Sequence, residues 1–568
     1  MNRKSIINLI AVAAFGATLA TGCKPATSRP DGDNQELDKS KTIVYCSNFK
    51  GAFGYKWLQE AAKRYEELHK DDVYQEGKKG VQIWIDNNKN GASDLLAGMS
   101  SNRDDIFFTE WAYYYDIVRS GWALDLTDIV TEKLTKYGET KSIEDKLTTE
   151  QKNFYNVDGH YYTLPHYQGF SGITYDKDFF ADECLYFALD TANSDDGFIV
   201  SEDQEKSYGP DGLPGTYDDG LPATYDDFFK LCNRMKNTVG ISPILFTGST
   251  PIYYQWFSTA LMADYEGLDQ TMLNYTFKGT ANSIVNSFDG VDNPVIGDLP
   301  ITSRNGYQLA KQAGRYYSLK FTEGLVNGGY FDNECFGTLS HIDAQKYFIN
   351  GGYGGAKRYG MLIDSNYWEN EVNDVGGFAA MEKKYGANKT SRTARNFGFM
   401  PFPKATSDKI GQANTLVDYL CSGAFIKSSI EEYKKELALD FMQFLYTDVS
   451  LNEWTAVTGT PKSINYELTA DTLSKLSPYS RDVLELRRNS DIVYPYANSE
   501  IYKNNASAFG VETYWETNVI KNGKQTPYSY PHTAMRNDKV TAKEYFLGLE
   551  ALRSKDSWEN SYSNFFED

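Results

Sequence analysis

The chain has 568 residues, and its 57 Lys and Arg against 77 Asp and Glu give a formal net charge of −20. A chain this acidic lacks the basic surface that phosphate backbones require, which excludes nucleic acid as a partner. The five cysteines that follow Cys23 are odd in number, widely spaced and without a CxxC pair, which argues against a disulfide framework or a zinc site. The length is sufficient for two or more lobes with large cores.

The N-terminus reads as a targeting segment. Two basic residues precede an apolar run over 6–20 that is too short to span a bilayer, and small residues then lead to Cys23. This order resembles a bacterial lipoprotein signal, which implies that residues 1–22 are a signal peptide and that Cys23 carries the lipid, including palmitate. The alternative is an ordinary secretory signal that contains a cysteine. Residues 23–40 are polar and contain Pro, Gly and Ser, so we expect a lipid-anchored flexible tether at the outer face of the cytoplasmic membrane.

Strands alternate with helices in the next part of the chain. The patterns predict strands over 42–46, 81–85 and 105–108 and helices over 55–69 and from 94 onward. In the first helix, we expect one apolar face formed by Leu58, Ala61, Ala62, Tyr65 and Leu68. This alternation predicts an α/β fold with a parallel sheet, in which ligands bind beyond the carboxyl ends of the strands.

An octapeptide occurs almost twice, as GLPGTYDD over 212–219 and GLPATYDD over 220–227. The second copy predicts a helix start, with Thr224 as the cap and two acidic residues in the first turn. The first copy lies in an acidic insertion over 190–220. Its Asp211, Asp218 and Asp219 are candidate ligands for a structural Ca²⁺, because Ca²⁺ prefers oxygen ligands on a glycine-rich loop. The alternative is a solvated acidic loop.

A family resemblance emerges along the chain. The segment VDGHYYTLPHYQGFSGITYDKDFF over 157–180 resembles the interlobe crossover of family 1 extracellular solute-binding proteins, the receptors of sugar ABC importers. LLAGMSSNRDDIFFTEW, LPATYDDFFKLCNRMK, GMLIDSNYWENEV and FMPFPKA resemble further landmarks of that family in the same order. The resemblance implies an α/β, two-lobe periplasmic-binding-protein-like fold with hinge crossovers and additional C-terminal helices. The N-terminal lobe would comprise 41–165 and 421–463, and the C-terminal lobe 166–420 and 464–568.

Signatures of catalysis are missing from the sequence. GxSxG, the Walker A loop and HExxH do not occur, and with 77 acidic residues apparent carboxylate pairs carry no weight. We therefore expect a binder and no enzyme. The resemblance implies capture of a sugar, which the large insertions suggest is an oligosaccharide, in an interlobe cleft. It further implies delivery to ABC permease subunits, and we expect a monomer. Two alternatives stay open: a surface glycan-binding lipoprotein not coupled to an ABC importer, and a secreted glycoside hydrolase.

The sugar site should combine aromatic rings with amide, carboxylate and hydroxyl groups. The content of 43 Tyr, 32 Phe and 9 Trp suits such a site, although an aromatic core would explain it equally well. The resemblance places candidate substrate-binding residues in three regions: Asn48, Phe49, Asn88, Asn90, Glu110 and Trp111 in the first lobe; His166, Tyr167 and Gln168 at the hinge; and Tyr253, Tyr254, Trp256, Asp364, Tyr367 and Trp368 in the second lobe.

Several of these candidates have a structural alternative. Glu110, Trp111 and Trp368 are favoured as ligand contacts. Phe49 and Trp256 fit a core equally well, and one of the adjacent Tyr253 and Tyr254 should face inward. His166 fits a hinge cap, and the asparagines and Asp364 fit turns. The cleft tryptophan of the family falls on Tyr367 by count, which leaves open whether Tyr367 or Trp368 stacks on the sugar.

Overall fold

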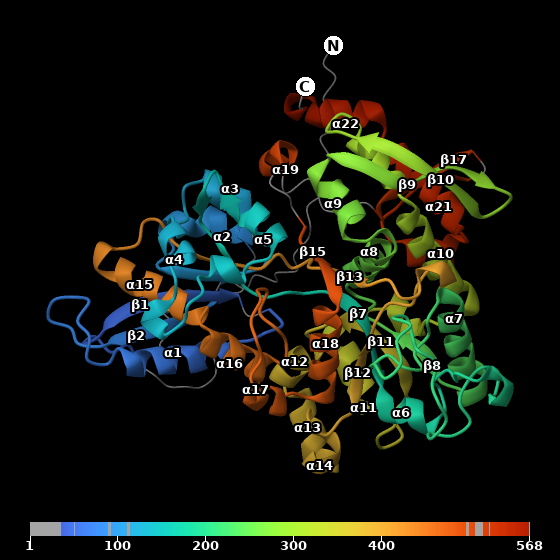
Figure 1. The fold of residues 1–568 in the computed structure, drawn as a ribbon, viewed down its shortest axis with the longest axis horizontal. Coiled ribbons are helices and arrows are strands. Elements are labelled where there is room, and N and C mark those ends of the chain that lie inside the picture. Colours follow the sequence, from blue (N-terminus) through green and yellow to red (C-terminus); the bar gives the residue numbers. More distant parts are fainter. Residues whose placement is uncertain are drawn as a thin grey trace.

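The computed structural model describes residues 36–49, 51–88, 92–110, 114–495, 499–505, 515–521 and 523–566. Three of the predicted functional residues, Cys23, Asn90 and Trp111, lie outside these ranges, and for Asn88 only the backbone is described. Figure 1 shows two lobes side by side, with the blue N-terminal elements in one and the green and yellow elements in the other. The expected α/β architecture with two lobes is confirmed.

The first lobe is built on a five-stranded sheet with the order β2-β1-β3-β14-β6. Its strands are β1 (Thr42–Phe49), β2 (Val81–Asn88), β3 (Ile106–Thr109), β6 (Leu164–Pro165) and β14 (Gly423–Ile426). β1 pairs in parallel with both β2 and β3, as the alternation of strands and helices predicts. β14 returns from the second half of the chain and pairs antiparallel with β3 and β6.

Helices from both ends of the chain cover this sheet. They are α1 (Lys56–Leu68), α2 (Ala92–Gly98), α3 (Tyr114–Arg119), α4 (Thr127–Thr131), α5 (Thr149–Tyr155), α15 (Glu432–Leu445) and α16 (Asp448–Thr458). The apolar face predicted for α1 is buried at four of its five positions, but Leu68 is 63% exposed. Leu68 is the last residue of α1, where the helix ends and its side chain faces solvent.

The second lobe contains a four-stranded sheet with the order β12-β7-β11-β8. The strands are β7 (Ser171–Asp176), β8 (Ser242–Leu245), β11 (Tyr359–Ser365) and β12 (Phe397–Met400). β8 and β11 are parallel, and β7 runs antiparallel between β11 and β12. The parallel pair places the carboxyl ends of β8 and β11 at the same edge of the sheet.

The second lobe is rich in helices. They include α6 (Lys177–Asp182), α7 (Tyr225–Arg234), α8 (Ile252–Glu266), α9 (Leu268–Thr276), α10 (Ala313–Gly328), α11 (His341–Asn350), α12 (Trp368–Asp374), α13 (Gly377–Tyr385), α14 (Ala387–Thr390), α17 (Ala470–Ser474) and α18 (Pro478–Arg488). The second octapeptide copy starts α7, where Thr224 and Asp227 form a reciprocal capping box. The two copies differ in burial, since Leu221 is fully buried whereas Leu213 of the first copy is 59% exposed. The second copy is therefore structural, as predicted.

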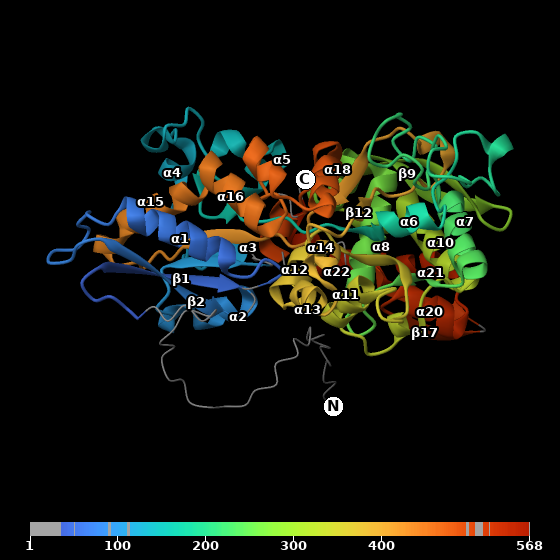
Figure 2. The ribbon, with the colours of Figure 1, turned by 90° about the horizontal axis from the view of Figure 1, so that it is seen from below.

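Three crossovers join the lobes, which Figure 2 shows side by side from below. The first leads from β6 to β7 and the second from β13 (Asn414–Val417) to β14. The third leads from α16 to α17 and α18, after which β15 (Ser490–Val493) pairs in parallel with β13. Such multiple crossovers allow the lobes to rotate about a short hinge.

The remaining elements extend the second lobe. They include a hairpin of β9 (Gly279–Asp289) and β10 (Asn293–Ile301) and a second hairpin of β16 (Thr517–Lys521) and β17 (Lys524–Tyr528). The C-terminal helices are α19 (Glu500–Asn505), α20 (Pro531–Asp538), α21 (Ala542–Leu552) and α22 (Lys555–Tyr562), of which α20 and α21 contact α10. Within the described ranges, no helix combines the length and the apolar character that a membrane span needs.

Candidate functional site

The two lobes meet at the carboxyl ends of their strands. β1 ends at Phe49 and β11 at Ser365, and the loop after β1 contacts the segment after β11. The Phe53 and Tyr367 ring centroids are 5.7 Å apart in a T-shaped arrangement, and Asn370 Nδ2 donates to the Ala52 carbonyl at 2.8 Å. This is the edge at which α/β sheets bind their ligands. The lobes are therefore in contact at the place where the sequence predicts the cleft.

Aromatic rings from both lobes and the hinge line this contact. We call Phe53, Tyr167, Trp256, Tyr367 and Tyr419 the interlobe aromatic cluster. Phe53 lies 4.3 Å from Tyr167, Trp256 stacks on Tyr419 at 4.1 Å and 14°, and the Tyr419 hydroxyl donates to the Tyr367 hydroxyl at 3.2 Å. Tyrosine and tryptophan present an apolar face together with a polar edge, which matches the CH faces and hydroxyl rim of a sugar ring. The cluster can thus stack on and hydrogen-bond to a polyhydroxylated ligand.

Glu110 follows β3 and faces the cluster from the first lobe. Its carboxylate accepts a hydrogen bond from the Tyr167 hydroxyl. Burial raises the pKa of Glu110 to about 7, against the lowering effect of the Tyr167 bond, and the charge of Glu371 raises it further. Gly51 has a φ of +46°, and a Cβ there would collide with the Glu110 carboxylate and lie 2.9 Å from the Tyr167 hydroxyl. Only glycine allows the loop to pass this closely.

The second lobe contributes a hydrogen-bonded acidic group. Gln345 Nε2 donates to Asp364 Oδ2 at 3.1 Å and to Glu371 Oε2 at 2.6 Å. His341 Nε2 lies 3.5 Å from Glu371 Oε1, and its ring stacks on Tyr253 at 5.7 Å. Burial and then the charge of Glu371 raise the pKa of Asp364 to about 7. These side chains adjoin the interlobe aromatic cluster, because Ser365, next to Asp364, hydrogen-bonds to Tyr419.

Several predicted residues gather at this interlobe contact. They are Glu110, Tyr167, Tyr253, Trp256, Asp364 and Tyr367. Phe49 is half-buried at the end of β1, and Asn88 ends the neighbouring strand.

Three other predicted residues face elsewhere. Asn48 is buried and its Nδ2 donates to the Gly54 carbonyl at 3.1 Å, so it shapes the loop after β1, and a ligand contact stays a prediction. His166 is buried behind the cluster, where its Nδ1 lies 3.2 Å from Lys462 Nζ. Gln168 Oε1 accepts from Arg487 Nε at 2.7 Å and thus points toward α18. The sequence could not separate these roles, because neighbouring residues of an extended crossover point in opposite directions.

Trp368 and Tyr254 lie in the core of the second lobe. Trp368 is fully buried among Phe348, Phe397 and Tyr479. Tyr254 is fully buried as well, as expected for one member of the pair that it forms with Tyr253. The stacking role predicted for Trp368 is therefore corrected in favour of Tyr367, which begins the turn into α12 and faces the other lobe.

The carboxylates of the first octapeptide copy accept hydrogen bonds from amides of the same loop. Asp218 accepts from the Asp211 amide at 3.2 Å, Asp211 from the Leu213 amide at 2.8 Å, and Asp219 from the Gly215 amide at 2.8 Å. Burial raises the pKa of Asp218 to about 6. No group of three or more His, Cys, Asp or Glu side chains converges on a metal position within the described ranges. These carboxylates bind amides of their own loop, and calcium binding stays a prediction.

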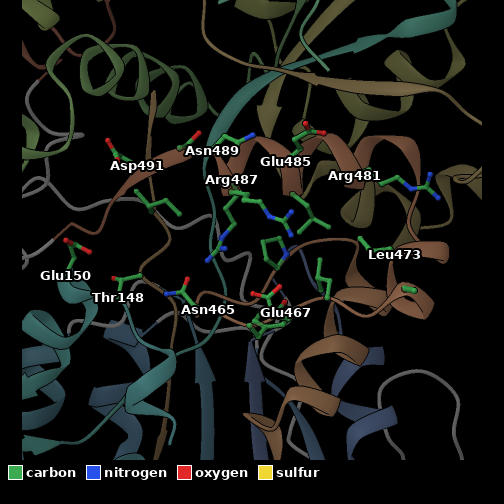
Figure 3. A pocket seen from close by; sticks show the side chains of 18 of the residues that line it. Thr148, Glu150, Asn465, Glu467, Leu473, Arg481, Glu485, Arg487, Asn489 and Asp491 are labelled. Carbon is green, nitrogen blue, oxygen red and sulfur yellow. The ribbon is translucent and has the colours of Figure 1, made fainter. Parts of the chain in front are cut away.

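A cavity of about 1240 Å³ lies between the lobes beside the third crossover (Figure 3). Thr148 and Glu150 of the first lobe and the segment from Asn465 to Leu468 form one wall, and α18 and the start of β15 form the opposite wall. Tyr466 is the sole aromatic residue among those that line it. A sugar site needs stacking rings, so we favour the interlobe aromatic cluster, whose side chains are buried where the lobes touch.

Five residues of the site escaped prediction. Phe53 and Tyr419 lie in connecting segments that have no strand or helix period to reveal their direction. His341 and Gln345 belong to α11, which the sequence analysis did not place at the cleft. Glu371 could have been predicted, because it lies four residues after Tyr367, and residues four apart share a helix face.

Comparisons with known proteins agree with this fold. A family model described as bacterial extracellular solute-binding protein matches residues 54–450. A chitin oligosaccharide binding protein has the same fold, with a TM-score of 0.54 and 15% identity over 92% of this chain and 100% of its own. RafE in complex with raffinose gives a TM-score of 0.52 and 13% identity over 90% of this chain and 100% of its own.

A structure from work on xylan utilization by the thermophilic bacterium Caldanaerobius polysaccharolyticus gives a TM-score of 0.52 and 13% identity, and covers 90% of this chain and 99% of its own. At these identities the likeness concerns the fold. No curated protein matches the chain in sequence. The family model spans well over half of the chain, and the chain belongs to the bacterial extracellular solute-binding protein family.

Proposed function

We propose that this protein is an extracytoplasmic receptor that captures an oligosaccharide between its lobes and delivers it to an ABC permease. The observation that carries the proposal is the interlobe aromatic cluster, which combines stacked rings, hydroxyl groups and carboxyl groups at the facing strand ends. The names of two similar structures, a chitin oligosaccharide binding protein and a complex with raffinose, support a sugar as the ligand.

The function is binding without catalysis. In an open form, the rings of both lobes are accessible to a sugar. Closure then brings Phe53 of one lobe toward Tyr367 of the other, and contacts to both lobes favour the closed form. A micromolar affinity corresponds to about −8 kcal/mol, which a few stacked rings and several hydrogen bonds can supply after the cost of association. The closed monomer would then dock on the permease.

Thermal unfolding with a panel of oligosaccharides tests the proposal. A ligand present at about one hundred times its dissociation constant adds about 2.7 kcal/mol to the free energy of unfolding and raises the midpoint. We expect a shift with one class of glycan. If no glycan shifts the midpoint, the ligand is not a sugar. Incubation of the same glycans with the protein should yield no hydrolysis products.

The lipid anchor and the permease need separate tests. We propose that Cys23 is lipidated and holds the mature protein at the outer face of the cytoplasmic membrane through its tether. Mass spectrometry of the membrane-extracted protein should find diacylglycerol on Cys23, and Cys23→Ser should release the protein. Co-purification with a permease only in the presence of glycan would support coupling to import.

A further inference from the structure

The ionisable side chains at the interlobe contact are mostly acidic. Glu110 comes from the first lobe, and Asp364 and Glu371 from the second. Their partners are neutral or weakly basic: the Tyr167 hydroxyl for Glu110, Gln345 Nε2 for Asp364 and Glu371, and His341 for Glu371. Within the part of the chain that the structure describes, no lysine or arginine forms a salt bridge with any of the three. The site therefore gathers acidic side chains without a lysine or arginine partner, and His341, beside Glu371, is the basic group among their partners.

These carboxyl groups influence one another across the lobes. The charge of Glu371 raises the pKa of Glu110 in the opposite lobe and that of Asp364 in its own lobe, in each case after burial. The pKa of His341 is raised despite its burial, because Glu371 stabilises the imidazolium. Lys50, next to Gly51 in the sequence, lies outside the described residues, and its single charge is outnumbered by the three carboxyl groups. A ligand carboxylate or sulfate brought into this contact would be repelled by Glu371 and by the ionised fraction of Glu110 and Asp364, and His341 would offset part of that repulsion.

The site also contains a buried hydrogen-bond acceptor. Gln345 is fully buried, and while its Nε2 binds the two carboxylates, its Oε1 has no partner. A buried carbonyl oxygen without a donor is costly, and a ligand donor that reached it would recover that cost. The acceptors at the site are thus carboxylate and amide oxygens. Sugar hydroxyls and amines can donate to them, whereas sulfates and ligand carboxylates offer only further acceptors.

We infer that the interlobe site takes uncharged or amine-bearing oligosaccharides and rejects those that carry carboxylate or sulfate groups. This selection rests on the proposed function, since it assumes that the interlobe aromatic cluster holds the sugar. Glu371 is the residue that sets it most strongly, because it is near Asp364 through Gln345 and acts on Glu110 across the lobes.

The experiment measures dissociation constants for three matched classes of oligosaccharide at neutral pH and fixed ionic strength. The protein is the chain from residue 23 with Cys23→Ser. The probes are uncharged oligomers of glucose, xylose, mannose and N-acetylglucosamine, an amine-bearing glucosamine oligomer, and acidic oligomers of galacturonate, mannuronate and hyaluronan. We expect the tightest ligand to be uncharged or amine-bearing and to bind at least about tenfold more tightly than any acidic probe. An acidic probe as the tightest ligand would overturn the inference while leaving the sugar-binding function intact.

Absence of binding in all three classes overturns both proposals. A variant then tests the cause of the selection. Glu371→Gln removes one negative charge and keeps the shape and the acceptor. We expect it to reduce, by about threefold to tenfold, the preference for the bound oligosaccharide over a carboxylated form of the same oligosaccharide. Glu132→Gln, at an exposed position away from the contact, is the matched control and should leave this preference unchanged. An equal preference in wild type and Glu371→Gln would contradict the role of Glu371.

Discussion

Tyr367 connects the two lobes, and Tyr367→Ala is the substitution whose effect can be worked out most fully. The side chain is 3% exposed, its ring meets Phe53 of the other lobe, and its hydroxyl accepts from Tyr419 at the hinge. An aromatic pair contributes about 0.5–1.5 kcal/mol and a hydrogen bond about 0.5–1.5 kcal/mol. The contact with Phe53 exists only when the lobes are together, so its share of the loss, about 0.5–1.5 kcal/mol, falls on the closed form. The proposed stacking of Tyr367 on the sugar brings the expected loss from the ligand-bound closed form to about 1–3 kcal/mol.

This loss predicts an affinity for the identified glycan that is about 5- to 150-fold weaker. Isothermal titration calorimetry provides the dissociation constant. Tyr367→Phe is the matched control, because it keeps the ring and removes only the hydroxyl, and it should weaken binding by no more than about tenfold. Circular dichroism of both variants checks that they fold. An unchanged dissociation constant for a folded Tyr367→Ala protein would refute the placement of the site.

Three further substitutions follow from the same structure. Trp368→Ala should lower the free energy of unfolding by about 3–5 kcal/mol, because Trp368 is a core residue, and should change the glycan affinity of the folded protein by no more than about threefold. A large loss of affinity with little destabilisation would indicate that Trp368 contacts the ligand. Burial lowers the pKa of Lys462 to about 7, so the unfolded chain binds more protons than the folded one between about pH 7 and 10.5, and stability should rise with pH across that window. In Lys462→Met, the thermal midpoint should rise less with pH over this window than in the wild type. An unaltered dependence of the midpoint on pH would contradict the burial of the Lys462 amine. Asp218→Ala removes the acceptor for the Asp211 amide and the Thr216 hydroxyl. We expect it to lower the free energy of unfolding by about 1–3 kcal/mol, by the same amount with added calcium and with a chelator. A loss seen only with calcium would favour a metal site.

More of the fold than of the candidate site could be predicted from the sequence. Period-two and period-3.6 patterns are local, so β1, α1, β2 and β3 were recognisable, and the Thr224 capping box confirmed the reading of the second octapeptide copy. β14 could not be derived this way, since its pairing with β3 joins segments more than three hundred residues apart.

Side-chain direction at the cleft was less accessible. Tyr367 and Trp368 are adjacent aromatic residues, and the sequence does not distinguish their directions. The turn into α12 places Tyr367 toward the other lobe and Trp368 in the core. His166 and Gln168 were placed at the correct crossover but face Lys462 and Arg487. Directions in such segments depend on tertiary packing, which a local pattern does not contain.

Hydrogen exchange of the protein with and without the identified glycan tests the central claim most directly, because it distinguishes the interlobe aromatic cluster from the cavity beside the third crossover. We predict that ligand protects amides in 51–55, 167–170, 365–371 and 418–422, the segments that form and adjoin the interlobe aromatic cluster. Protection confined to 465–468 and 481–492, which line the cavity of about 1240 Å³ beside the third crossover, would contradict capture between the facing strand ends.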